Sequence, residues 1–532
     1  MLEKIGLWLW YKMGGTGLEV LYTFLVFVVV IFLAMKLIEY WKYTLPPGPW
    51  GIPICGYLPF IKGDLYMEFG KLAKKYGSTF SVRFGSDLIV VLSDYKTIRQ
   101  AFQLDEFSGR PHNDFMNILD GYGVINTEGA LWKDQRKFIH TMFGTLSKKD
   151  GIKFLDNMIT NEVQLLLSEL EKRHGDPIDL SIYLSVSISN VICEFTMNER
   201  FRYDDERFKR FMNLINEGFT LFGRLTYANY IPILRYLPGI HSVRNKIAQN
   251  RTVMANFFQE IIDKHKRTNS YEVEDSISDV VDAYLYQIKE AEKKNEDHQL
   301  FQGKDKNRQI QQVMGDLFSA GMETVKNTLQ WAVVFMLHYP EAAKAVQDEL
   351  DQVVGRARIP LWEDMSKLPI TNATIQEILR KSNLVPLGTT HATTRDVTLN
   401  GYNLPAGTHV IPLLSAVHMD PIWNDPEDFR PSRFLNEGTV TKPKYFMPFG
   451  YGKRRCLGEK LAHMEIFLFF SSLMHRFNLN LPEGESLPDL QGNVGITISP
   501  APFKVCLLKR ELIGCDINEN IFNHGSLRKF GS

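Results

Sequence analysis

A short segment near the C-terminal end of the chain restricts the fold more than any other feature of the sequence. Residues Phe449–Gly458 read F-G-Y-G-K-R-R-C-L-G, and an apolar stretch with helical character, Leu461–Leu473, follows. At average residue usage, the pattern F-x-x-G-x-R-x-C-x-G matches a chain of 532 residues by chance on the order of once in ten thousand cases. A lone cysteine is usually an ordinary buried thiol, so it is the neighbours of Cys456 that distinguish it.

Each position of this segment suits a sulfur atom that is bound to a metal. Cys456 stands at the start of the expected helix, where the helix dipole and free N–H groups favour a thiolate. Gly450 and the two other glycines keep the backbone slim, so that a flat cofactor can approach and amides can point at the sulfur. Phe449 can pack beside the sulfur and limit water, and Arg454 can reach a carboxylate of the cofactor.

This segment resembles the cysteine loop of the cytochrome P450 family, and the resemblance extends from the proline-rich residues 45–53 to about Arg510. It implies a fold that is mainly α-helical with small β-sheets, and a haem b whose iron is bound by Cys456. A thiolate ligand donates electron density to the iron and favours cleavage of the O–O bond. The expected enzyme is therefore a monooxygenase that inserts one oxygen atom of O₂ into a lipophilic substrate.

The residues A-G-M-E-T, which begin at Ala320, lie in an expected helix over Arg308–His338 and match the family's A/G-G-x-E/D-T signature. Gly321 allows the helix to open or to approach a ligand. Thr324 can hydrogen-bond to oxygen during its activation, and Glu323 can relay the protons that O–O cleavage requires. Taken alone, such a threonine often bonds only to its own backbone and such a glutamate often faces solvent; the cysteine loop favours catalytic roles.

Three further residues match the family's donors to the haem propionates. Trp132 and Arg136 fit the pattern W-x-x-x-R, and their i,i+4 spacing places both on one helix face. His391 matches the third donor, although Thr390 stands where the family often has proline. Each residue taken singly is equally consistent with core packing or a surface pair.

Glu377 and Arg380 are spaced i,i+3 on an expected helix, where they can form an ion pair. On an exposed surface such a pair would contribute little stability. The resemblance implies the family's E-x-x-R pair, completed by Arg433, with Ser432 in the place of the usual glutamate. Its expected role is structural, holding the scaffold behind the cysteine loop.

The N-terminal region contains an uncharged apolar run, Val20–Met35, and Leu37–Ile38 continue it after Lys36, whose charged end can snorkel to the interface. As a helix, Val20–Ile38 would be about 28 Å long, close to the hydrocarbon core of a bilayer. A cleaved signal peptide is the alternative, but the run is long for one and no small-residue cleavage site follows. The expected organisation is a membrane anchor over 1–44, a proline-rich hinge over 45–53, a haem-binding monooxygenase domain over 54–510 and a disordered polar tail over 511–532.

Composition excludes several classes of protein. Lys plus Arg and Asp plus Glu each number 61, so no global charge excess favours nucleic-acid binding. A hydrophobic fraction of 44% is normal for a folded chain. Five cysteines without C-x-x-C spacing exclude a disulfide scaffold and argue against structural zinc, and they fit a body in the reducing cytosol.

Hydrophobic periodicity predicts most of the body to be helical, with small sheets. Expected helices include Asn161–Lys172 and Arg244–His265, and Gly77–Leu92 is an expected hairpin. Short strands are expected at Val397–Leu404 and Val410–Pro412, and an exposed charged loop at 289–306.

Among animal members, the chain most resembles the insect ecdysteroid 26-hydroxylases, as in LPPGPWGIPICG from Leu45 and HATTRDVTLNGY from His391. This resemblance implies hydroxylation of the ecdysteroid side-chain terminus at C-26, which inactivates the hormone. It also implies electrons from NADPH through a cytochrome P450 reductase, cytochrome b5 as a further partner, and an endoplasmic-reticulum membrane location with the catalytic domain on the cytosolic face. Alternatives are a broad monooxygenase of xenobiotics or fatty acids, a haem-thiolate isomerase and a non-catalytic haem sensor. Candidate substrate-facing segments are 107–130, 218–238 and 385–389.

Overall fold

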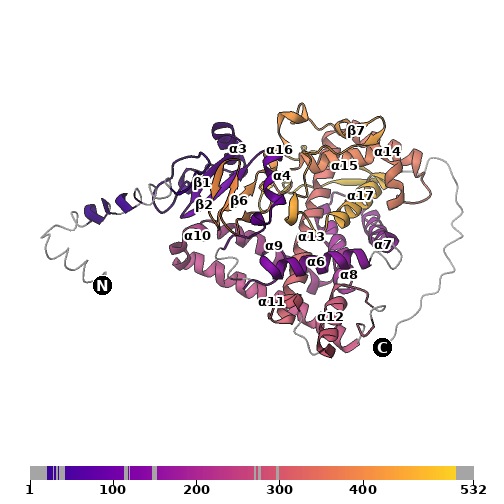
Figure 1. Cartoon of the computed structure of the whole chain (residues 1–532). Coiled ribbons are helices and arrows are strands. Elements are labelled where there is room, and N and C mark those ends of the chain that lie inside the picture. The colour runs from indigo at the N-terminus through magenta and orange to yellow at the C-terminus, as the bar shows by residue number, and fades with distance from the viewer. Residues whose placement is uncertain are drawn as a thin grey trace.

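A computed structural model describes residues 21–24, 26, 27, 29–31, 34, 42–112, 118, 120–146, 152–268, 271–273, 277–294 and 299–510. The fold is mainly helical with small sheets, as predicted (Figure 1). The helices are α3 (Leu65–Tyr76), α4 (Tyr95–Gln103), α6 (Gly129–Leu146), α7 (Ile152–Glu171), α8 (Leu180–Met197), α9 (Glu206–Arg224), α10 (Thr226–Tyr230), α11 (Pro238–Thr268), α12 (Val280–Lys294), α13 (Lys306–His338), α14 (Pro340–Val353), α15 (Pro369–Lys381), α16 (Leu414–His418) and α17 (Glu459–Arg476).

The sheets are small, and the largest has four strands in the order β1-β2-β6-β3. The predicted hairpin is present, with its turn at Gly85 and Ser86. β2 and β6 are parallel, whereas β3 and β6 are antiparallel. The other strands form the antiparallel pairs β4–β5, β7–β8, β9–β12 and β10–β11. The strands are β1 (Thr79–Phe84), β2 (Asp87–Leu92), β3 (His391–Ala392), β4 (Val397–Leu399), β5 (Tyr402–Leu404), β6 (His409–Pro412), β7 (Leu435–Asn436), β8 (Thr439–Val440), β9 (Phe477–Asn480), β10 (Asn493–Val494), β11 (Ile498–Ser499) and β12 (Cys506–Lys509).

Helix α13 runs through the core and packs along α8. The side chain of Asp305 caps its first turn by accepting from the amide of Arg308, and Pro340 follows its C-terminal end. The predicted helix over Arg308–His338 is therefore confirmed and begins two residues earlier. A Cβ at Gly321 would lie 2.5 Å from Cδ1 of Ile192, so glycine permits the close contact between α13 and α8.

One helix among the described residues, α8, is long and apolar enough to span a membrane, and 72% of it is buried inside the protein. It is therefore a core helix. Of the predicted anchor Val20–Ile38, the described residues are helical, and the remainder lies outside the described part of the chain. The predicted tail 511–532 also lies outside it.

The prediction of a loop over 289–306 was wrong at both ends of the segment. Helix α12 continues to Lys294, and a 3₁₀ turn follows at Gln299–Phe301. The residues after Lys289 are good helix formers, and the ion pair between Glu290 and Lys293 at 2.7 Å has the i,i+3 spacing of one helix face. Helices α7 and α11 are likewise longer than predicted.

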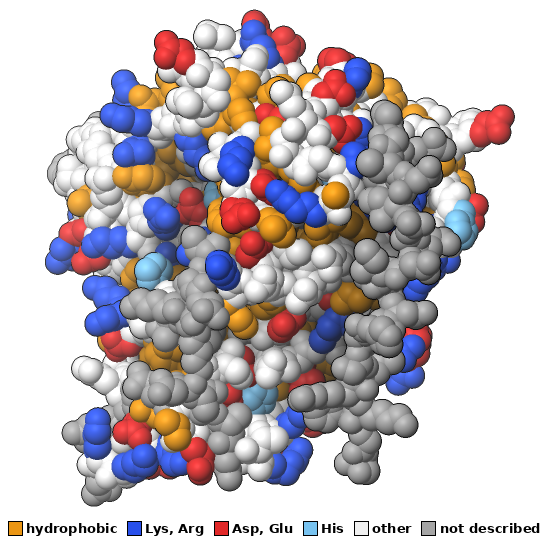
Figure 2. All heavy atoms as spheres, turned by 90° about the vertical axis from the view of Figure 1, so that its right-hand side faces the viewer, with side chains coloured by type: hydrophobic (Ala, Val, Ile, Leu, Met, Phe, Trp, Pro, Cys, Tyr) orange, Lys and Arg blue, Asp and Glu red, His pale blue; other side chains and the backbone are white. Residues whose placement is uncertain are grey.

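Charged side chains of both signs lie interspersed on the face drawn in Figure 2. Ion pairs at the surface form both within and between elements. Lys344 pairs with Asp348 within α14, and Arg476 of α17 pairs with Glu171 of α7.

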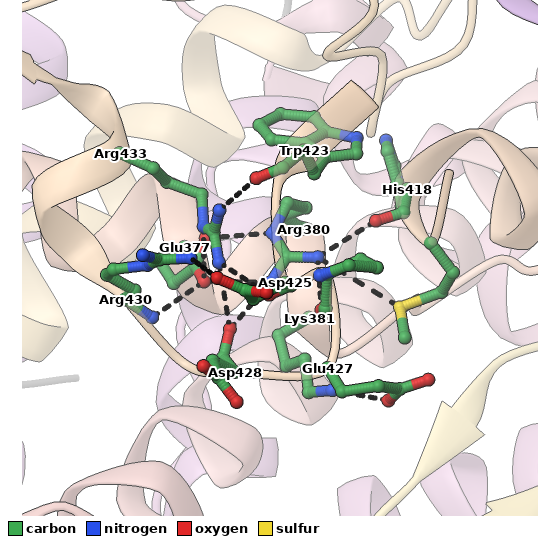
Figure 3. A network of polar contacts seen from close by, with 12 residues as sticks. Glu377, Arg380, Lys381, His418, Trp423, Asp425, Glu427, Asp428, Arg430 and Arg433 are labelled. Atoms are coloured by element: carbon green, nitrogen blue, oxygen red, sulfur yellow. Dashed lines mark hydrogen bonds and ion pairs between the residues drawn. The ribbon is translucent and has the colours of Figure 1, made fainter. Parts of the chain in front are cut away.

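Glu377 and Arg380 of α15 form a completely buried ion pair (Figure 3). Nε and Nη2 of Arg380 each donate to one oxygen of Glu377 at 2.8 Å. Arg433 reaches the same carboxylate, with 3.0 Å between its Nε and Glu377 Oε1. The ion-pair network therefore lies inside the protein. It is not an exposed surface pair, which would contribute little stability.

The two arginines use their remaining donors to bind the backbone of the segment that precedes the cysteine loop. Nη1 of Arg380 donates to the carbonyls of His418 and Pro426, at 2.8 and 2.9 Å. Both arginines donate to the carbonyl of Asp428 at 3.1 Å. One carboxylate therefore anchors a long irregular segment to α15.

We expect Glu377→Gln to lower the stability of the protein by about 3–5 kcal/mol, because two buried guanidinium groups lose their counter-charge. Thermal unfolding followed by circular dichroism measures the change. Glu427→Gln is the matched control, since Glu427 is 81% exposed and pairs only with Lys381 across 3.1 Å. Equal stability of the two variants would contradict the assigned role.

Candidate active site

The segment around Cys456 folds into a tight loop that leads directly into α17. The amide of Cys456 donates to the carbonyl of Phe449 at 2.9 Å, and the amide of Gly450 donates to Met447 at 3.0 Å. Gly450 has a φ of 72°, a left-handed conformation that favours glycine. The amide of Gly458 hydrogen-bonds to Cys456, as expected for a sulfur at the N-terminal end of a helix.

Cys456 keeps exposed surface although protein atoms surround it closely. Burial raises the pKa of its thiol to about 11, and the Gly458 amide and Arg136 only partly oppose this rise. In the protein alone, burial outweighs the contacts that favour the thiolate. A bound metal cation would supply the missing stabilisation, because a coordinating thiol loses its proton outright.

The cysteine loop is pressed against α4 at Gly452. A Cβ at this residue would lie 2.0 Å from the carbonyl oxygen of Phe102, and φ is 79°, so other residues would be strained as well as blocked. Two residues later, Arg454 turns inward and donates from Nε to Ser108 and from Nη2 to Thr127, at 2.9 and 2.5 Å. The loop is thereby fixed to segments far away in the sequence.

Arg454 lies in a cluster of cationic groups. Its guanidinium carbon is 3.8 Å from the ring centroid of Trp132, a cation–π contact. Burial together with Arg110 and Arg136 lowers the pKa of Arg454 to about 8. Arg110 is also buried, and its pKa falls to about 10 for the same two kinds of reason. His391 stacks on a phenylalanine ring within this cluster, and burial, Arg110 and Arg454 hold its pKa well below the usual value.

No carboxylate among the described residues forms an ion pair with Arg110, Arg136 or Arg454. Their hydrogen bonds go to backbone carbonyls: Arg110 to Ile125 and Thr390, and Arg136 to Arg455 at 2.6 Å. Buried positive charge without a counter-charge is costly, so this cluster fits a ligand that carries acidic groups.

One neutral donor adds to the fit with such a ligand. The indole N–H of Trp132 has no acceptor among the described residues. His391 uses Nδ1–H to donate to the carbonyl of Phe107 at 2.8 Å, and because its pKa lies well below the usual value, Nε2 carries no proton and can only accept a hydrogen bond. The residues therefore fit haem, whose two propionates would be held by this cluster and whose iron would be bound by Cys456.

The predicted catalytic residues lie on α13. Ala320 is exposed although Phe318 and Met322 beside it are fully buried, so one strip of this core helix is left uncovered. Thr324 lies one turn further along that strip, and its hydroxyl donates to the carbonyl of Ala320 at 2.7 Å. Glu323, the residue before Thr324, pairs with Lys326. No hydrogen bond or ion pair between described residues joins this group to the cysteine loop.

Sequence reasoning missed Arg110, Lys326 and Asn327. Arg110 carries no motif, and only the tertiary structure brings it to Arg454. Lys326 and Asn327 follow Glu323 at i,i+3 and i,i+4, a spacing that was visible in the sequence. Of the candidate substrate-facing residues, Phe115 and Met116 lie outside the described residues.

Comparisons with known proteins agree with this geometry. The cytochrome P450 family model matches residues 46–507. Cytochrome P450 18a1 of Drosophila melanogaster is 51% identical and covers 94% of each chain. Human cytochrome P450 2J2 is 36% identical over 87% of this chain and 90% of its own, and human cytochrome P450 2U1 is 34% identical over 88% and 89%.

The match covers the cysteine loop, the A-G-M-E-T helix, the buried triad and the cationic cluster, and it extends over nearly the whole chain. The chain therefore belongs to the cytochrome P450 family, the haem-thiolate monooxygenases.

Proposed function

We propose that this protein is a membrane-bound monooxygenase that hydroxylates ecdysteroids at C-26 of the side chain and so inactivates them. The observation that carries the proposal is the 51% identity to an insect member along 94% of the chain, against 36% and 34% for two human members. The resemblance of the segments from Leu45 and His391 to the insect ecdysteroid 26-hydroxylases supports the substrate class.

Haem, when bound, would supply the iron that activates O₂. The chain itself provides Cys456 as the ligand, and Arg454, Arg110 and Arg136 as counter-charges to the propionates. The small side chain of Ala320 leaves the strip of α13 uncovered. Insertion of one oxygen atom into a C–H bond also needs two electrons and two protons, which reduce the second oxygen atom to water. Thr324 and Glu323 are the proposed residues for those protons.

The electrons come from NADPH through a cytochrome P450 reductase, with cytochrome b5 as a second partner. Lys453, Arg455 and Lys460 are exposed around the cysteine loop and offer cationic side chains to an acidic partner, which would compete with Asp105 for Lys453 and with Glu459 for Arg455.

The membrane location rests on exposed apolar side chains at the N-terminal end. Leu21 and Phe27 are exposed in the predicted anchor, and Trp50 in the proline-rich hinge is 83% exposed. Ile54 and Tyr236 add exposed apolar surface on the body. A bilayer would cover such surface, which favours an anchor over 1–44, a hinge over 45–53 and a catalytic domain over 54–510 on the cytosolic face of the endoplasmic reticulum.

Purified protein with a competent reductase and NADPH should convert ecdysone to a product with one added oxygen at the side-chain terminus. Mass spectrometry and nuclear magnetic resonance identify the product, with a fatty acid and a drug-like amine as comparison substrates. Oxidation of the comparison substrates without any ecdysteroid product would reject the substrate and retain the monooxygenase.

Cys456→Ser should abolish the carbon-monoxide difference band of the reduced protein, because a serine hydroxyl does not replace the thiolate. Cys506→Ser is the control, since Cys506 lies in β12 away from the loop, and it should keep the band. A normal band in folded Cys456→Ser protein would refute the assignment of the ligand.

Thr324→Ala should retain haem but divert oxygen to hydrogen peroxide, lowering product formed per NADPH by about tenfold or more. Thr328→Ala tests whether any threonine of α13 would do the same, since the buried Thr328 hydroxyl only donates to the carbonyl of Thr324 at 2.8 Å. Equal coupling in the two variants would argue against a catalytic role for Thr324.

A further inference from the structure

Both oxygens of the Glu323 carboxylate are occupied by residues of the next helical turn. Lys326 donates from Nζ to Oε2 at 2.5 Å, and Asn327 donates from Nδ2 to Oε1 at 2.8 Å. The pair is largely buried, with exposed fractions of 17% for Glu323 and 13% for Lys326. A largely buried ion pair of this kind keeps one preferred geometry. In an exposed pair, water competes for the same hydrogen bonds and the side chains move more freely.

The neighbouring hydroxyl is held in the opposite direction along the helix. Thr324 donates to Ala320, one turn toward the N-terminus, whereas Glu323 is bound by residues one turn toward the C-terminus. The acid and the hydroxyl are therefore adjacent in sequence but are not hydrogen-bonded to one another in this structure.

Asn327 connects this pair to another part of the site. Its amide nitrogen also donates to Oγ1 of Thr497 at 3.0 Å, and its buried Oδ1 has no hydrogen-bond partner among the described residues. Thr497 precedes β11, and the next residue, Ile498, accepts from Trp331 of α13 and donates to Leu384. The position of the carboxylate is thus tied to the backbone just before the candidate substrate segment 385–389.

We propose that Lys326 and Asn327 are positioning residues that hold the Glu323 carboxylate in place, and that they set the fraction of consumed oxygen that ends in hydroxylated product. The inference rests on the proposed role of Glu323 in supplying protons. A glutamate side chain has several rotamers, and proton transfer requires the donor within hydrogen-bond reach, so two fixed partners reduce the time spent in unproductive orientations.

Each turnover takes up O₂, two electrons and two protons and gives one hydroxylated product and one water. If the protons arrive in the wrong place, the same electrons and protons leave with both oxygen atoms as hydrogen peroxide. The ratio of product to NADPH consumed therefore measures proton placement, whereas haem binding and substrate affinity are measured separately.

We expect Lys326→Met to lower the product formed per NADPH about threefold to tenfold, less than the roughly hundredfold minimum for loss of a general acid. Hydrogen peroxide should rise by the corresponding amount. The carbon-monoxide band and the KM for ecdysone should stay near those of the unmodified protein, which separates positioning from misfolding, while the thermal midpoint should fall because Glu323 loses its counter-charge. Lys326→Arg, which keeps the cation, should recover at least half of the lost coupling.

Lys306→Met is the matched control, because Lys306 is on the same helix and forms only a surface pair with Glu292 at 3.4 Å. It should couple normally. The double variant Glu323→Gln/Lys326→Met should couple no worse than Glu323→Gln alone, since Lys326 acts through Glu323.

Normal coupling in Lys326→Met, or a full additional loss in the double variant, would overturn the inference. Normal coupling in Glu323→Gln with product still formed would locate the failure in the role of Glu323. A protein that oxidises no ecdysteroid but couples well on a fatty acid would reject the proposed substrate, and the same coupling test would then proceed on that fatty acid.

Discussion

Three guanidinium groups, those of Arg110, Arg136 and Arg454, lie together without a carboxylate partner among the described residues. This arrangement is unfavourable by itself, because burial and mutual repulsion lower the pKa of Arg454 to about 8. An acidic ligand would offset this repulsion, and the two propionates of haem have the required charge.

Two other groups of buried charges, in contrast, have partners of opposite charge within the protein. Glu377, Arg380 and Arg433 satisfy each other and the backbone around them, so they need no ligand and hold the segment before the cysteine loop. Glu323 and Lys326 also satisfy each other, at the position proposed above for proton delivery. Compensation by the protein therefore does not by itself distinguish scaffold from site.

Local spacing in the sequence was sufficient for much of this. The pairing of Glu377 with Arg380 and the helix over Arg308–His338 follow from spacing within a few residues, which the sequence displays directly, whereas the A-G-M-E-T signature was identified by its resemblance to the family. The prediction of a charged loop over 289–306 was wrong because a charge-rich sequence is compatible with a helix as well as with a loop. Opposite charges spaced i,i+3 stabilise a helix. The anchor and the tail fall largely or wholly outside the described residues and stay predictions.

The sequence by itself determined the family, because the cysteine loop is one continuous segment that carries the family's pattern, and it predicts Cys456 as the metal ligand. Only the tertiary structure decided which charges remain without partners. Arg110 meets Arg454, and Asn327 meets Thr497, through contacts between segments far apart in the chain, and no local spacing encodes them. Compensation of charge is a property of three-dimensional packing, since a counter-charge can come from any element that folds close enough.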